Sequence, residues 1–253
     1  MDSGNENAGL NLAQFFQRNT ELTEETSFQF LRQMVSENLS GKPVNYAQAE
    51  SIALAPSRLD ASLADCLQRR GSNKQFAPSP VRFAALSTLL TCALAPGELK
   101  ENGLRQRPYP SAGGLYPVSV YLFARHVEQL DTGIYHVNAG RQVLEKLHGY
   151  AGPEALDAQL DPMIIREPDD PKPSFYLLLS GDLALIRRKY GDRGYRFMLL
   201  EAGHIAQNLC LLATALGLLH LPLGGFCEPE LEQLLGVREV GLMSLYLLEF
   251  GNR

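Results

Sequence analysis

The segment from Arg107 to Pro117, with the sequence RPYPSAGGLYP, combines rigid and permissive positions in a way that suits ligand binding. Prolines restrict the backbone on both sides, whereas the Ser-Ala-Gly-Gly centre at residues 111–114 has almost no side-chain bulk. A large flat ligand can therefore approach this backbone and bind its free N–H and C=O groups. The alternative is an ordinary loop at a tight packing point, and the segment alone does not separate the two.

A second candidate site lies upstream, where Arg70, Ser72 and Lys74 alternate along a short segment that follows an expected helix. In an extended segment these two cations and the hydroxyl project from one side. That geometry suits an anionic group such as a phosphate. The alternative is a solvated basic turn.

The third feature is a long uncharged stretch, because no Asp, Glu, Lys or Arg occurs from Ala202 to Cys227. Its length resembles that of a membrane span. However, Glu201, His204, Gln207 and Asn208 form one polar stripe at helical spacing. We therefore expect a buried helix that ends at Gly217, followed by a glycine-rich loop, and no membrane partner.

Bulk properties narrow the class of protein. The 253 residues are 45% hydrophobic and 20% charged, which is typical of a globular chain with a full core. A net charge of −5 argues against nucleic acid as a partner. The polar, acidic N-terminus does not resemble a signal peptide, so we expect a cytoplasmic protein. The cysteines and histidines lack zinc-ligand spacing, so no metal site is expected.

The elements that must position these residues follow from apolar patterning. We expect an N-terminal helical extension at residues 1–59, with a helix near residues 27–35, and a second domain at residues 60–253. Within the second domain, periodicity predicts helices at 60–67, at 81–95 and soon after 151. Apolar runs predict strands at 118–123, 133–137, 142–144, 175–180 and 244–251.

Flavin mononucleotide (FMN) needs a segment that binds its phosphate tail, backbone that contacts its ring, and an apolar surface beside the ring. The segment at residues 70–74, the glycine loop and the long uncharged helix match these three needs. Residues 60–251 also resemble the nitroreductase superfamily, in the motifs at Arg70–Phe76, Pro108–Pro117 and Glu201–Asn208. More narrowly, they resemble its azoline dehydrogenase branch, the SagB-type oxidases of thiazole- and oxazole-containing peptide pathways. The resemblance implies an α+β, nitroreductase-like fold with a central mixed β-sheet flanked by helices. It also implies an intertwined homodimer with FMN at the subunit interface.

The resemblance also implies roles for particular residues. The phosphate and ribityl end of FMN would contact Arg70, Ser72 and Lys74, although Gly71 stands where the family usually has a second arginine and Lys74 where it has an arginine. The isoalloxazine ring would lie against Pro110, Ser111, Ala112, Gly113 and Gly114. A second glycine segment near the cofactor would be Gly224, Gly225 and Phe226. For Gln207 and His204, a polar contact in the dimer core is an equally good interpretation.

The run from Lys189 to Arg196 resembles the lysine–tyrosine segment of azoline dehydrogenases, in which the pair is catalytic. Conversion of an azoline to an azole removes a proton from the α-carbon and a hydride from the β-carbon. A lysine with a lowered pKa, or a tyrosinate at Tyr190 stabilised by Lys189, would serve as the base. The flavin would accept the hydride, and O₂ would restore it. The alternative is a basic helix start with Tyr190 and Tyr195 in packing positions.

These features predict FMN-dependent oxidation of thiazolines or oxazolines, in a peptide or on a carrier protein, beside a partner cyclodehydratase. One alternative is a nitro- or quinone reductase that takes hydride from NAD(P)H. Another is a non-catalytic scaffold that holds partner enzymes, which the N-terminal residues keep open. The sequence does not identify the peptide, the partner proteins or the preference for sulfur or oxygen rings.

Overall fold

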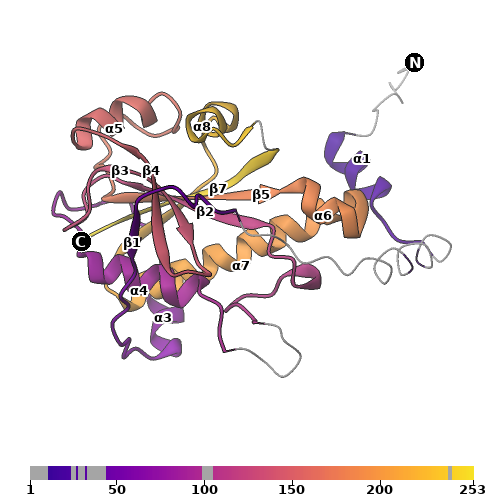
Figure 1. Cartoon of the computed structure of the whole chain (residues 1–253), viewed down its shortest axis with the longest axis horizontal. Coiled ribbons are helices and arrows are strands. Elements are labelled where there is room, and N and C mark those ends of the chain that lie inside the picture. Colours follow the sequence, from indigo (N-terminus) through magenta and orange to yellow (C-terminus); the bar gives the residue numbers. More distant parts are fainter. Residues whose placement is uncertain (1–10, 24–26, 28–31, 33–43, 99–104, 239–240) are drawn as a thin grey trace, which may run out of the picture.

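In the computed structural model, residues 11–23, 27, 32, 44–98, 105–238 and 241–253 are described. Their centre is a seven-stranded sheet with the order β1-β4-β3-β2-β5-β7-β6 (Figure 1). The strands are β1 (Ser51–Ala53), β2 (Val118–Ala124), β3 (Gly133–Asn138), β4 (Val143–Gly149), β5 (Phe175–Asp182), β6 (Leu219–Leu223) and β7 (Leu242–Gly251).

All paired strands of this sheet run antiparallel, so the expected mixed sheet is wrong for the described residues. Short connections join β2, β3 and β4, and such connections favour antiparallel neighbours. The strands β5 and β6 point the same way, but β7 lies between them and pairs antiparallel with both. The α+β fold class itself is confirmed.

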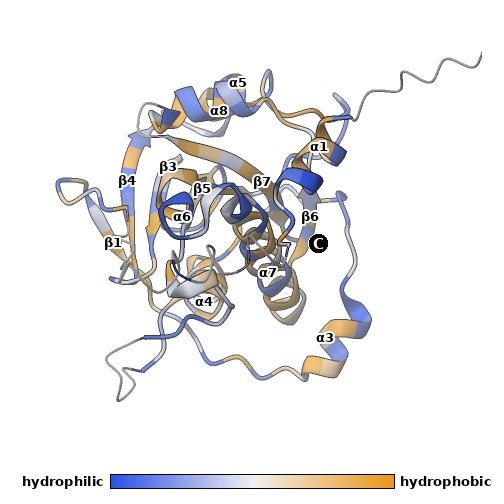
Figure 2. Ribbon diagram, turned by 90° about the vertical axis from the view of Figure 1, so that its right-hand side faces the viewer, coloured by the Kyte–Doolittle hydropathy of each residue, from blue (hydrophilic) through white to orange (hydrophobic). Residues whose placement is uncertain are grey.

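Helices cover both faces of the sheet (Figures 1 and 2). One core packs β2, β3 and β5 against α4 and α7, and the other packs the opposite face against α5 and α8. The helices are α1 (Leu12–Asn19), α3 (Leu63–Arg69), α4 (Phe83–Leu94), α5 (Pro153–Leu160), α6 (Leu183–Tyr190), α7 (Gly194–Ala215) and α8 (Glu228–Leu235). Each face of the strands is thus apolar, which explains their nearly continuous apolar runs.

The longest helix, α7, confirms the interpretation of the uncharged stretch. It ends just before Gly217, whose φ of 75° lies in the left-handed region that glycine adopts at little cost. Its polar stripe is divided, because Glu201 is buried whereas His204 and Gln207 are exposed. None of the helices in the described ranges has the length and apolar character needed to cross a membrane.

Strand β6 is missing from the expected elements, because Pro222 and the glycines after it predict a loop. The strand tolerates this proline because β6 is the last strand in the sheet order, and among the described residues its outer side is bridged at His220, by Ser72, and not at Pro222. The other edge strand, β1, lies within residues 1–59, so the end of the expected extension belongs to the sheet. Most of the helix expected near 27–35 lies outside the described residues, and the two-domain division stays a prediction.

Candidate active site

The loop at residues 107–117 leads directly into β2 at the centre of the sheet. Its middle is a single 3-10 turn, Ala112–Gly114, in which Gly113 and Gly114 have φ values of 61° and 65°. These left-handed conformations favour glycine, because a Cβ would approach the following carbonyl oxygen. The glycine pair thus allows a tight turn and adds no side chains of its own to it.

Helix α7 holds both ends of this loop. Near its beginning, the Asn208 side-chain amide donates to the Pro108 carbonyl oxygen at 3.0 Å. At its end, the Val118 N–H donates to the buried Glu201 carboxylate at 3.3 Å. Within the loop, the Tyr116 N–H donates to the Ser111 hydroxyl at 2.8 Å. The backbone is therefore held from beneath by a rigid helix.

Glu201 is a site residue that the sequence did not single out for a role. Its side chain is 2% exposed, and burial raises its pKa to about 7, although the neighbouring Ser111 hydroxyl, the Val118 N–H and the positive charge of Arg107 oppose this rise. Among the described residues, its Oε2 atom has no hydrogen-bond partner. The polar stripe contained the signal, but helical spacing does not tell which of its members face the core.

Arg107, Tyr109 and Tyr116 form a cluster of one cationic and two aromatic side chains in the loop that contains the glycine turn. The Arg107 guanidinium donates to the Tyr109 hydroxyl at 2.8 Å and lies 4.7 Å from the centre of the Tyr116 ring. The loop borders an open groove with a volume of about 650 Å³, which is in the range of small-molecule sites. Of the residues expected against the isoalloxazine ring, Pro110, Ser111, Gly113 and Gly114 line this groove. The fifth, Ala112, packs against the core instead.

Lys189 and Tyr190 reach the same glycine turn from α6. A Cβ placed on Gly113 would lie 2.6 Å from the Tyr190 hydroxyl oxygen and 2.9 Å from Lys189 Nζ. The chain achieves this approach at the corner between β5 and α6. There Asp182 caps α6 by accepting from the Leu185 N–H, and its own N–H donates to the Pro117 carbonyl. The two motifs, far apart in sequence, thus meet at one glycine.

The environment of Tyr190 sets its protonation state. The ring is buried and packs edge-to-face on Phe197, with the ring centres 5.0 Å apart. Burial raises the pKa of Tyr190, which argues against the tyrosinate that the sequence left open. The Lys189 amine lies 5.9 Å from the centre of the Tyr190 ring. Among the two, Lys189 is therefore the better candidate for a base.

The expected phosphate segment lies near Cys210, in the C-terminal part of α7. Arg70 follows the end of α3, and Ser72 forms a parallel bridge with His220 of β6. Burial and the positive charge of Arg70 lower the pKa of His220 to about 4. The positive charge of Arg70 also opposes the rise that burial causes in the pKa of Cys210.

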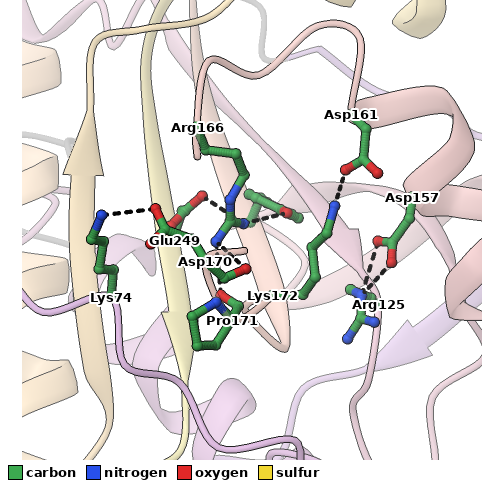
Figure 3. Close-up of polar contacts among 10 residues, drawn as sticks. Lys74, Arg125, Asp157, Asp161, Arg166, Asp170, Pro171, Lys172 and Glu249 are labelled. Atoms are coloured by element: carbon green, nitrogen blue, oxygen red, sulfur yellow. Dashed lines mark hydrogen bonds and ion pairs between the residues drawn. The ribbon is translucent and has the colours of Figure 1, made fainter. Parts of the chain in front are cut away.

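The side chain of Lys74, expected to bind the phosphate, is paired with a carboxylate of the protein. Its ammonium group forms an ion pair with Asp170 at 2.8 Å, and its side chain is 46% exposed (Figure 3). The Asp170 segment is held in place by Arg166, which donates to the Pro171 carbonyl at 2.7 Å and pairs with the buried Glu249 at 3.2 Å. Lys74 is therefore tied to a rigid part of the molecule.

Four further residues were expected near the cofactor: Gln207, Gly224, Gly225 and Phe226. None of them is among the described residues that line the groove. Gly225 accepts a backbone hydrogen bond from the Ile165 N–H at 2.9 Å, and Phe226 is buried in the core on the α5 and α8 side of the sheet. Gly224 and Gln207 are both exposed. The chain thus brings Lys189 and Tyr190 to the glycine turn, whereas the other predicted cofactor residues are not among the residues that line the groove. In the described ranges, no group of three or more His, Cys, Asp or Glu side chains could hold a metal ion.

The seven-stranded antiparallel sheet, with helices on both faces and a glycine turn before its central strand, is an α+β fold. The chain belongs to the nitroreductase family, whose model matches residues 67–251. Proteins of this family typically bind FMN.

Two relatives extend this assignment. A Methanocaldococcus jannaschii protein named as a nitroreductase is 31% identical over 191 residues, which cover 75% of this chain and 92% of the relative. The microcin B17-processing protein McbC of Escherichia coli is 28% identical over 156 residues, which cover 60% of this chain and 56% of McbC. The match therefore spans little more than half the length of McbC.

Solved structures show the same fold. A nitroreductase structure from Anabaena variabilis has a TM-score of 0.75 at 20% identity, with 94% of this chain and 46% of that chain covered. The E. coli microcin synthetase McbBCD complex with truncated pro-MccB17 bound has a TM-score of 0.63 at 24% identity, with 94% and 86% covered. An Exiguobacterium sibiricum nitroreductase structure in complex with FMN has a TM-score of 0.54 at 13% identity, with 77% and 90% covered.

Proposed function

We propose that this protein is an FMN-dependent dehydrogenase that oxidises thiazoline or oxazoline rings, in a peptide or on a carrier protein, to thiazoles or oxazoles. The observation that carries the proposal is the approach of Lys189 and Tyr190 to Gly113 in the loop that we assign to the flavin ring. A proton acceptor and a hydride acceptor would then flank one substrate ring. Similarity to McbC, a microcin B17-processing protein, supports a peptide as substrate.

The proposed reaction removes a proton from the α-carbon of the azoline and a hydride from its β-carbon. Bound FMN would supply the hydride acceptor, with O₂ taking the electrons. Because the neighbouring C=N and carbonyl groups acidify the α-proton, a modest base suffices, and Lys189 is the residue that we assign to this role. The phenol of Tyr190 keeps its proton, since burial raises its pKa, and its hydroxyl orients the ring by donating a hydrogen bond.

The chain offers a fitting surface for FMN. The turn at residues 111–114 contributes little side-chain bulk of its own, and a Cβ at Gly113 would collide with Lys189 and Tyr190. In the proposed site, Pro110, Ser111, Ala112, Gly113 and Gly114 line the ring, whereas Arg70, Ser72 and Lys74 bind the phosphate end. Further contacts come from Gln207, Gly224, Gly225 and Phe226.

The segment at residues 70–74 does not line the groove beside the glycine turn, and we propose that the site is completed in an intertwined homodimer. Support comes from the outer face of α7. Its Leu199 and Leu200 side chains are 42% and 59% exposed, next to the exposed His204 and Gln207. Contiguous apolar exposure of this kind marks an interaction surface. The similarity to the McbBCD complex supports a further assembly with a cyclodehydratase.

Mass spectrometry tests the activity. A synthetic peptide with one thiazoline, incubated with the protein, FMN and air, should lose the mass of two hydrogen atoms. The same peptide with a thiazole in place of the thiazoline is the matched control and should not change. Absence of any mass loss in the presence of bound FMN, with cyclodehydratase added, would refute the assigned reaction.

The second candidate is a nitro- or quinone reductase that takes hydride from NAD(P)H, and the Methanocaldococcus relative named as a nitroreductase favours it. Anaerobic mixing with NADPH separates the two activities. Rapid loss of the flavin absorbance would favour the reductase, whereas loss only after addition of the azoline peptide would favour the dehydrogenase. A colourless protein that does not take up FMN would instead support a scaffold role.

A further inference from the structure

The side chain of Arg107 is held in place by two tyrosines of its own loop. Its guanidinium donates to the Tyr109 hydroxyl at 2.8 Å and lies over the Tyr116 ring, 4.7 Å from the ring centre. The backbone N–H of Arg107 donates to the Tyr116 hydroxyl at 3.1 Å, and the two rings meet edge-to-face with their centres 5.8 Å apart. A long side chain that is already ordered loses less conformational entropy when it binds a ligand.

The backbone of Tyr116 is strained in a way that serves this arrangement. Its φ of 50° lies in the left-handed region, which is costly for a bulky residue. Such strain persists only where surrounding contacts fix the conformation, and it is concentrated at ligand sites. Here the Tyr116 N–H donates to the Ser111 hydroxyl, and the Tyr116 hydroxyl accepts from the backbone of Arg107. The strained residue therefore places its ring against the guanidinium.

The positive charge of Arg107 is half-buried and has no ion-pair partner among the described residues. By contrast, the more deeply buried Arg166 pairs with Glu249 at 3.2 Å. Of the five N–H groups on the Arg107 guanidinium, one bonds to Tyr109 within the described ranges, which leaves donors for a ligand. An ordered cation of this kind suits an oxygen atom that carries negative charge.

Arg107 borders both the glycine turn and the helix that carries Lys189. Together with Gly113 it lines the groove of about 650 Å³. It also lines a small cavity of about 40 Å³ whose wall includes Asp182, the cap of α6. The last residues of α6 are the pair that reaches Gly113. The glycine turn is thus bordered by an amine and by a guanidinium that come from different elements.

We propose that Arg107 is a further catalytic residue of the azoline oxidation. Its guanidinium binds the oxygen of the carbonyl group attached to the α-carbon and stabilises the negative charge that develops there; the inference rests on the proposed function. When Lys189 takes the α-proton, the electron pair of the broken C–H bond spreads onto this oxygen and onto the ring C=N. The same pair forms the double bond between the α- and β-carbons as the hydride leaves the β-carbon. A preorganised cation at the oxygen lowers the barrier to the first of these steps.

Steady-state kinetics on a thiazoline peptide test this role, with the full chain loaded with FMN. Arg107→Ala should lower kcat by about a hundredfold or more and change KM little, because the charge develops only after the substrate has bound. Arg107→Lys should lose less, since an ammonium group keeps the charge but not the fork of donors. The control is Arg105→Met, which removes an exposed cation that lines the same groove and should keep the wild-type kcat.

Chemical rescue distinguishes a catalytic guanidinium from a structural one. Guanidinium chloride at a low, non-denaturing concentration should restore part of the activity of Arg107→Ala, whereas the same concentration of NaCl should not. Unchanged kcat in Arg107→Ala would overturn the proposal. An equal loss in Arg105→Met, or no rescue beyond that given by NaCl, would overturn it as well.

The alternative partner of Arg107 is the flavin, because oxygen atoms of its ring also gain negative charge on reduction. The reduction potential of bound FMN and its dissociation constant should stay close to the wild-type values in Arg107→Ala. Both are measured from the flavin absorbance. A shift in potential large enough to account for the loss of kcat would overturn the proposal in favour of the flavin.

A binding measurement separates this inference from the proposed function. Thiazole-4-carboxylate carries a negative oxygen in the position of the carbonyl group, and 4-methylthiazole is the matched probe without it. By calorimetry, the carboxylate should bind at least about tenfold more weakly to Arg107→Ala than to wild type, and the methyl probe should bind both alike. If wild type oxidises no azoline but this difference is found, the proposed function fails and the oxygen site at Arg107 remains. If azolines are oxidised and the difference is absent, the inference alone fails.

Discussion

The loop at residues 107–117 and the segment at residues 70–74 both lie along α7, yet their polar groups meet different partners. The loop is held by Glu201 and Asn208 and receives Lys189 and Tyr190 at its glycine turn. In the segment, Lys74 is paired with Asp170, and Ser72 is bridged to a strand. A single chain thus brings together the residues proposed for the reaction, whereas the residues proposed for the phosphate contact other residues of the same chain.

The largest effect is expected from Lys189→Ala. Removal of a general base typically costs a factor of 10² to 10⁴, so azole formation should fall by roughly a hundredfold or more. Tyr190→Phe should also lose azole formation, because it removes the hydroxyl that reaches Gly113. Turnover is measured by mass spectrometry, and bound FMN by its absorbance, which should be unchanged in both variants. Arg187→Ala, an exposed cation on the same helix, is the control; full turnover by Lys189→Ala would remove its assigned role.

The meeting of these two motifs marks a limit of sequence reasoning. Apolar runs were sufficient to predict β2, β5 and β7, because strands buried on both faces are continuous in sequence. The proline-flanked glycines were sufficient to predict a bare turn at Gly113. That Lys189 reaches this turn depends on the corner at Asp182, whose cap and backbone hydrogen bond join distant parts of the chain. The spacing of residues along the sequence does not predict such a contact.

Gly113→Ala should have the next largest effect. The new Cβ would enter the space of the Tyr190 hydroxyl and Lys189 Nζ, and a φ of 61° adds a strain of roughly 1–2 kcal/mol. We expect weaker FMN binding together with about a tenfold loss of turnover, because both side chains must move. The matched control is Gly114→Ala, which has the same strain at a φ of 65° but no atom within 4 Å of the new Cβ. Equal turnover of the two variants would show that the approach of Lys189 and Tyr190 is not needed.

Glu201→Gln tests the support beneath the loop through the pH dependence of stability. The pKa of Glu201 is about 7 in the folded chain against an ordinary 4.5, so the folded state binds the proton more tightly than the unfolded state. Stability from this group is therefore complete below about pH 4 and is lost as the pH rises to about 7. The difference amounts to roughly 3 kcal/mol at 1.36 kcal/mol per pH unit.

Glutamine cannot ionise, so its variant should gain stability relative to wild type between about pH 5 and pH 8. Urea denaturation of both proteins across this range measures the difference. Parallel stability curves would mean that burial does not raise the pKa of Glu201 above its value in the unfolded chain. The polar stripe of α7 made this residue visible in the sequence. Its burial depends on how α7 packs beneath the start of β2, which periodicity does not specify.

The smallest effects are expected in the phosphate segment. Lys74→Ala should weaken FMN binding, whereas Asp170→Asn should strengthen it, because the ammonium group is then released from its ion pair. An exposed pair is worth about 0.2–1 kcal/mol, so each change should alter the dissociation constant by a factor of about 1.5 to 5. Titration monitored by flavin fluorescence measures this constant. Asp161→Asn is the control, because its partner Lys172 lies outside the proposed phosphate contacts. A weaker affinity in Asp170→Asn would instead mean that the aspartate positions Lys74 for the phosphate, and the two halves of the site would then be organised alike.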